Sequence, residues 1–136
     1  MYLNQIDKSN YFRAMLLLSG KDKKISTEER EFMDKLGQKL GFEASFRRHA
    51  INSLFENDYI GKEPPRFSSP EIARSFIRDG IKLIISDPQL NQHEIDWLAN
   101  VAKVNGVDEN FIYEELNKFR NSVRAREPQL EIENYL

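Results

Sequence analysis

The segment Asp22–Phe42, DKKISTEEREFMDKLGQKLGF, has a counterpart later in the chain in Asp87–Val107, DPQLNQHEIDWLANVAKVNGV. Both copies contain an Asp, a hydrophobic residue three positions later, a Glu seven positions after the Asp, and a Gly 19 positions after it. The same spacing of polar and apolar residues in two segments predicts two copies of one structural unit.

Each copy contains the signals of a helix start and a helix end. Ser26 can cap a helix to which Glu29 reaches back, which is the arrangement of a capping box. Asn91 and Glu94 stand at the equivalent positions of the second copy. The glycine near the end of each copy suits the left-handed residue that often follows a helix. The recurring segment therefore predicts a turn followed by one capped helix.

The similarity continues on both sides of this segment, without a gap, from Tyr11 to Phe119. Apolar residues recur at helical spacing before and after the capped helix in both copies, so each unit is predicted to contain three helices. The first helix is expected at Tyr11–Gly20. The third is expected from about 43 to 55, with Phe46 among its buried residues.

These patterns predict an all-α fold, with a single domain of about six to seven helices. Repeat unit one covers about 11–55, a connector 56–68, repeat unit two about 69–120, and a C-terminal tail 123–136. Three short helices leave an apolar face uncovered, so neither unit is expected to fold alone. We therefore expect the two units to pack around a pseudo-two-fold axis.

The tail has a different pattern, because Gln129–Glu133 alternates apolar and polar residues as an extended strand does. Two alternatives stay open for it. It is a flexible tail, or it docks its apolar side chains on the helices. The side chains that would dock are Leu130, Ile132, Tyr135 and Leu136.

Composition excludes several classes of function. The chain has 136 residues, 20 Lys and Arg against 22 Asp and Glu, and no Cys. It therefore has no bulk positive charge for nucleic acid, and no thiolate for a metal site or a catalytic nucleophile. Its longest apolar run is far shorter than the about 20 residues that span a bilayer, so direct membrane insertion is not expected. A cytoplasmic location is expected, since the start does not resemble a signal peptide.

Four acidic residues are candidate metal ligands: Asp22, Glu29, Asp87 and Glu94. Their spacing matches the second half of a calcium-binding EF-hand loop, and hard oxygen ligands across a turn can converge on a divalent cation. A second interpretation needs no metal, because both Glu residues lie at the third position of a capping box and both Asp residues lie in turns. The residues alone favour this structural interpretation.

A complete EF-hand is excluded in both units. The first half of the loop lacks side-chain oxygens, and Lys23 and Pro88 occupy the position at which the calcium loop requires Gly. No catalytic residues are predicted, because no phosphate-binding loop, zinc pattern or nucleophile–base pair occurs at a recognisable spacing.

The sequence resembles the TerB-like family of tellurite-resistance proteins. The resemblance lies in the motif Asp-x-x-Ile-Ser-x-x-Glu at Asp22–Glu29, in the similar segment Asp87–Glu94, and in the glycine that ends the helix after each of them. The resemblance covers roughly Tyr11 to Phe119. It implies a helical domain with two related halves and a non-enzymatic role in bacterial stress response. It also implies acidic residues that bind a divalent cation such as calcium, here Asp22, Glu29, Asp87 and Glu94, and a protein partner, for which an integral membrane protein is a candidate.

The leading hypothesis is thus a non-enzymatic helical binding or adaptor domain of the TerB-like type, modulated by a divalent metal and acting through protein partners. The alternative is a small-molecule-binding or enzymatic domain that uses the groove between the two repeats. A third hypothesis is a purely structural dimer. The sequence leaves the oligomeric state open.

Overall fold

The computed structural model describes residues 3–19, 26–53, 63–85, 92–121 and 130–136. Within these ranges the chain is all-α, with six α-helices, one short 3-10 helix and no strand. The predicted fold class is confirmed at this level. The part of the chain that the structure describes contains no helix long and apolar enough to cross a membrane.

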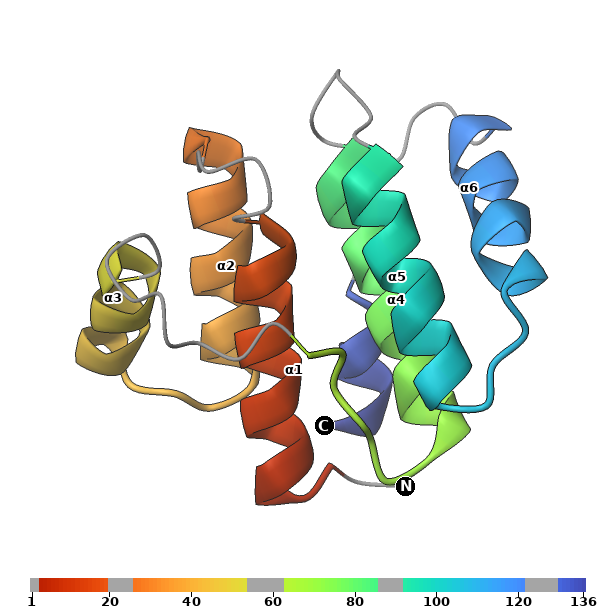
Figure 1. Ribbon diagram of the computed structural model, residues 1–136. Coiled ribbons are helices and arrows are strands. Elements are labelled where there is room, and N and C mark those ends of the chain that lie inside the picture. Colours follow the sequence, from red (N-terminus) through yellow and green to blue (C-terminus); the bar gives the residue numbers. More distant parts are fainter. Residues whose placement is uncertain (1–2, 20–25, 54–62, 86–91, 122–129) are drawn as a thin grey trace.

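The helices form two groups that meet along α1 and α4 (Figure 1). Their bounds are α1 Gln5–Ser19, α2 Thr27–Lys39, α3 Ala44–Ser53, α4 Pro70–Ile85, α5 Gln92–Val104, α6 Asn110–Asn121 and the 3-10 helix η1 Glu131–Tyr135. In the first group α2 contacts both α1 and α3, and in the second α4 contacts α5, α6 and η1. α4 therefore lies at the centre of the molecule.

The predicted capping box of Ser26 and Glu29 is present, whereas Asn91, the predicted cap of the second copy, lies outside the described residues. Ser26 accepts a hydrogen bond from the amide of Glu29 at 3.0 Å, and the Glu29 carboxylate accepts one from the amide of Ser26 at 3.1 Å. The hydroxyl of Ser69 accepts from the first turn of α4 at 3.4 Å, and the carboxylate of Asp108 accepts from the amide of Asn110 at 2.9 Å. Each of these side chains satisfies an amide that has no partner within its helix.

The predicted glycine stops are present as well. Gly41 has φ of 88° and Gly106 has φ of 71°, so both occupy the left-handed region that disfavours side chains. The amides of the next residues, Phe42 and Val107, donate to carbonyls five residues earlier at 3.0 and 2.8 Å. The ends of α2 and α5 are therefore closed in the same way.

The helix bounds follow the register seen in the sequence, in which Asp22 corresponds to Asp87. In this register α2 and α5 begin at corresponding positions and end at corresponding positions, and α1 and α4 also begin at corresponding positions. α6 begins one position later than the register would place it relative to α3.

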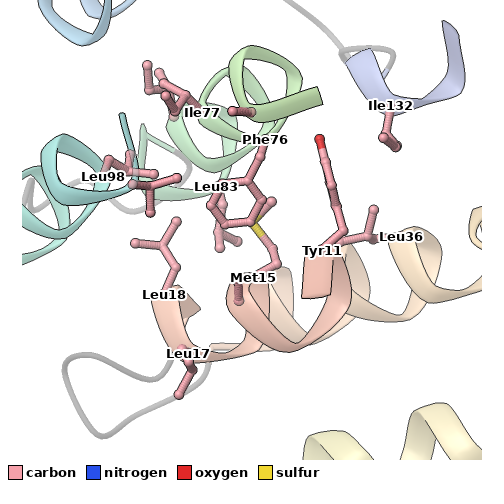
Figure 2. Close-up of a cluster of buried hydrophobic side chains, with 14 of the residues drawn as sticks. Tyr11, Met15, Leu17, Leu18, Leu36, Phe76, Ile77, Leu83, Leu98 and Ile132 are labelled. Atoms are coloured by element: carbon pink, nitrogen blue, oxygen red, sulfur yellow. The ribbon is translucent and has the colours of Figure 1, made fainter. Parts of the chain in front are cut away.

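The contact between α1 and α4 is filled by fully buried side chains, several of which Figure 2 shows. They are Tyr11, Met15, Leu18, Phe76 and Leu83. The helices approach closely at Gly80, where an added Cβ would lie 3.0 Å from Leu18 and 3.1 Å from Leu98. A larger residue there would force these leucines to move.

Two expectations for the first unit are wrong. α1 begins at Gln5 rather than Tyr11, because the Asn4 side chain accepts a hydrogen bond from the amide of Asp7 at 2.7 Å and so caps the first turn. Phe46 is 51% exposed rather than buried, although its ring lies 5.1 Å from that of Phe42. Helical spacing placed it on the apolar face of α3, but Phe12 of α1 and Phe42 cover only part of its ring. The last residues expected in the third helix, 54 and 55, lie outside the described residues.

The end of the tail is helical rather than extended, as η1 shows. Of the two alternatives for the tail, docking is correct for Leu130 and Ile132, which are 3% and 0% exposed, whereas Leu136 is 43% exposed. Leu130 itself has an extended backbone, and the 3-10 helix begins directly after it. Residues 123–129 of the predicted tail lie outside the described residues.

The conformation of Gly106 gives a first prediction. Gly106→Ala is expected to lower the free energy of unfolding by about 1 kcal/mol, because an Ala side chain is strained at positive φ. No atom lies within 4 Å of the added Cβ, so this cost comes from the backbone alone. Gly106→Asn is the matched control and should cost less, since Asn tolerates this region. Urea unfolding of the three chains measures the difference, and equal stabilities of the Ala and Gly chains would contradict it.

Candidate functional site

The structure places only part of the predicted metal site. Asp22 and Asp87 lie outside the described residues. Glu29 and Glu94 lie in the first turns of α2 and α5, and are 6% and 5% exposed. The Glu29 carboxylate is engaged in the capping box. Within the described ranges, no three His, Asp or Glu side chains come together as a metal site would require.

The densest group of buried polar contacts surrounds a residue that the sequence analysis missed. Asp79, in the middle of α4, is 0% exposed. It lies three residues after Phe76 and four before Leu83, on the buried stripe of its helix. An acidic residue at helical spacing within an apolar stripe was the signal that could have identified it, because a buried charge requires partners.

Three donors from two distant segments bind the Asp79 carboxylate. The hydroxyl of Tyr11 donates to Oδ2 at 2.7 Å. The backbone amide of Glu131 donates to Oδ1 at 2.7 Å, and that of Ile132 donates to Oδ2 at 3.2 Å. Figure 2 shows the Tyr11 side chain extending from α1 toward α4 and η1, where Ile132 lies. Asp79 thus joins α1 and η1 to α4.

A buried lysine adds positive charge to this group. The side chain of Lys82 is 5% exposed, and its Nζ lies 3.8 Å from Asp79 Oδ1 and 3.6 Å from a carboxylate oxygen of Glu131. The same Nζ lies 5.7 Å from the centre of the Phe119 ring, within the range of a cation–π contact. Lys82 therefore offsets the charges of two carboxylates on different elements.

Burial raises the pKa of Asp79 from its ordinary 3.8 to about 6. The hydrogen bonds from Tyr11 and from the amides of Glu131 and Ile132, together with the charge of Lys82, lower the pKa but do not cancel the effect of burial. Burial, reinforced by the charge of Asp79, raises the pKa of Tyr11 well above its ordinary value of 10.0. The Tyr11 hydroxyl therefore stays protonated and remains a donor.

We call Tyr11, Lys39, Asp79 and Lys82 the tail-binding site, and residues 130–136 the C-terminal segment. Lys39, at the end of α2, lies 3.4 Å from the carboxylate of Glu133 and so contributes a second ion pair to the segment. The site combines one buried acceptor for backbone amides with two lysines. Chemically, this arrangement recognises a peptide backbone flanked by acidic side chains.

Two other polar residues, the buried Asp7 and the half-buried Asn105, fix the chain before α4. Asp7, 2% exposed, accepts hydrogen bonds from the amide and the hydroxyl of Ser68 at 3.0 and 2.5 Å. Asn105 accepts from the amide of Phe67 and donates to the carbonyl of Pro65, both at 2.8 Å. In the described part of the chain, every buried side-chain nitrogen and oxygen has a hydrogen-bond partner.

No protein-family model matches this chain, and neither a curated protein nor a solved structure matches it. Function is therefore inferred from the geometry of the tail-binding site and the helices around it.

The pKa of Asp79 gives a second prediction. Between about pH 4 and pH 6 the folded chain keeps a proton on Asp79 that the unfolded chain has lost, so this residue makes the fold less stable as pH rises through that window. The full effect is about 3 kcal/mol. Asp79→Asn cannot titrate. We expect the difference in unfolding free energy between the two chains to change across pH 4–7, and a constant difference would contradict the prediction.

A third prediction concerns the donor on α1. Tyr11→Phe removes the hydroxyl and leaves the carboxylate of Asp79 with one donor fewer, which is expected to cost about 1–3 kcal/mol at pH 7. The loss should be smaller at pH 4, where Asp79 is protonated, and the pKa of Asp79 should rise further. Tyr113→Phe is the matched control, since Tyr113 is 51% exposed. Chemical denaturation at the two pH values tests this, and equal losses in both variants would count against it.

Proposed function

We propose that the chain is a non-enzymatic helical binding domain that acts through a protein partner in the cytoplasm, as the resemblance to TerB-like stress-response proteins implies. The observation that carries the proposal is that a fully buried carboxylate, Asp79, binds the backbone amides of another segment. A domain that provides a charged, buried acceptor for a peptide backbone is suited to binding protein segments rather than to chemistry on a small molecule.

The relation between the two helix groups supports the two-repeat part of the proposal. α2 and α5 have the same length and the same glycine stop, at corresponding positions of the two repeats. Tyr11 and Phe76 also occupy equivalent positions in this register, and their rings are in edge contact with centres 5.1 Å apart. Equivalent residues of two repeats contact each other when they lie near a two-fold axis, so this contact supports the proposed pseudo-two-fold arrangement, in which the axis would pass close to the pair.

The filling of the contact between α1 and α4 favours a binding domain over the alternative. An enzyme or small-molecule binder that uses this place needs an open groove with converging polar groups. Met15, Phe76 and Leu83 instead fill the place with apolar side chains that are 0% exposed. Asp79, a buried polar residue of α4, is already bound by the chain's own residues.

Modulation by a divalent cation such as calcium remains part of the proposal, through Asp22, Glu29, Asp87 and Glu94. Titration with calcium, magnesium, manganese and zinc, followed by amide NMR, tests it. Shifts localised near these four residues would support binding. The absence of localised shifts at millimolar concentrations of all four ions would remove the metal from the proposal.

The fourth prediction separates the two roles of Glu29. Glu29→Gln keeps an oxygen that can accept from the amide of Ser26, so its unfolding free energy should stay within about 0.5 kcal/mol of the parent chain. Glu29→Ala removes the acceptor and is expected to cost about 1 kcal/mol. If Glu29 is a metal ligand, both variants lose the localised shifts in the titration. Thermal or chemical unfolding without metal measures the contribution of the cap to the free energy of unfolding. Equal decreases in this free energy for Glu29→Gln and Glu29→Ala would contradict the capping role.

Capture from native cells tests the central proposal. The tagged full-length chain is expected to retain a protein in stoichiometric amount. Retention of a small molecule alone, detected by native mass spectrometry, would favour the alternative function.

A further inference from the structure

The C-terminal segment is bound in the way that a domain binds a peptide ligand. Its first residues alternate apolar and acidic side chains, Leu130-Glu131-Ile132-Glu133. The two apolar residues are 3% and 0% exposed. The two acidic residues lie 3.6 Å from Lys82 and 3.4 Å from Lys39. Each of four successive residues therefore has its own contact in the fold.

Side chains and backbone are recognised together. While Leu130 and Ile132 are buried, the amides of Glu131 and Ile132 donate to the two oxygens of Asp79 at 2.7 and 3.2 Å. Backbone hydrogen bonds provide affinity for any chain in this conformation, and the apolar and charged contacts select the sequence. The site therefore specifies a pattern of the form apolar, acidic, apolar, acidic.

The four residues of the tail-binding site belong to α1, α2 and α4, and none of them belongs to the segment that they bind. α1 and α4 also contact each other through Tyr11 and Phe76, whose ring centres are 5.1 Å apart. α1 and α4, which carry three of the four residues of the tail-binding site, thus contact each other without the C-terminal segment. The segment follows α6 in the chain and packs mainly on α4.

We propose that the tail-binding site is a peptide-binding site for an acidic–apolar segment, that the chain's own residues 130–133 occupy it as an intramolecular ligand, and that a partner segment of the same pattern takes their place. This inference rests on the proposed function and gives the chemistry of the partner. Because Asp79 without the amide donors would be a poorly paired buried charge, exchange of one occupant for another is favoured over an empty site.

The intramolecular ligand sets the conditions for exchange. A tethered segment acts at an effective concentration of about millimolar, so a free peptide with the same contacts competes poorly against the intact chain. A partner has to make further contacts, or the segment has to be weakened, before exchange is seen. The test therefore weakens the segment and leaves the tail-binding site unchanged.

The first experiment uses the unmodified chain. Hydrogen exchange is expected to be at least tenfold faster at the amides of Glu131 and Ile132 than at the most protected amides of α4, because the segment opens without unfolding of the helices. Exchange of these two amides only at the rate of global unfolding would overturn the proposal, since the segment would then be inseparable from the fold.

The second experiment adds a peptide to a variant. Isotope-labelled Ile132→Ala chain is titrated with an unlabelled peptide of residues 129–136, QLEIENYL. Saturable shifts are expected at Tyr11, Asp79 and Lys82. A peptide with Ile132→Ala should bind at least tenfold more weakly, whereas one with Leu136→Ala should bind like the parent, because Leu136 is 43% exposed. Equal binding of all three peptides, or none at millimolar concentration, would overturn the proposal.

A chain with Leu130→Ala replaces the Ile132→Ala chain if that variant does not fold. Failure of the inference is distinguishable from failure of the proposed function. If the peptide does not bind, but the full-length chain still retains a protein from native cells, the partner binds elsewhere and only the inference is wrong. If the chain retains no protein from native cells but does bind the peptide, the proposed protein partner is wrong, and the tail-binding site is still a peptide-binding site.

Discussion

The carboxylate of Asp79 lies where water cannot reach it, so every donor that it needs has to come from the chain itself. Tyr11 lies 68 residues before it, and the amides of Glu131 and Ile132 lie 52 and 53 residues after it. One acidic residue in the central helix thereby fixes the relative positions of an early helix and the C-terminal segment. Lys82, one turn away on the same helix, reduces the cost of this arrangement without cancelling it.

The position of α4 explains why Asp79 contacts residues from distant parts of the chain. The helix contacts α1, α5, α6 and η1, and most of its buried residues are apolar. Gly80, the residue after Asp79, permits the close approach of Leu18 and Leu98 to α4. A tightly packed, apolar surrounding leaves no route for solvent to the carboxylate. This burial raises the pKa of Asp79. It also strengthens the hydrogen bonds that Asp79 accepts from the backbone amides.

Most features governed by neighbours in the sequence were predictable, although the cap that Asn4 forms at the start of α1 was missed, and features governed by distant contacts were not. The capping box at Ser26 and the left-handed Gly41 and Gly106 were predicted correctly, because caps and stops depend on a few adjacent residues. Asp79 was missed because its partners come from both ends of the chain. The docking of Ile132 stayed an open alternative for the same reason. The metal hypothesis remains a prediction, since Asp22 and Asp87 lie outside the described residues.

The separation between Asp79 and its amide donors also bears on how the protein is made. The ribosome adds Glu131 52 residues after Asp79, when α4, α5 and α6 have already been synthesised. Until then the carboxylate has Tyr11 and Lys82 as partners but lacks both amides. A nascent chain that has not yet reached residue 131 therefore leaves the carboxylate of Asp79 without either backbone donor, so the docking of the C-terminal segment has to follow the synthesis of the helix that it docks on.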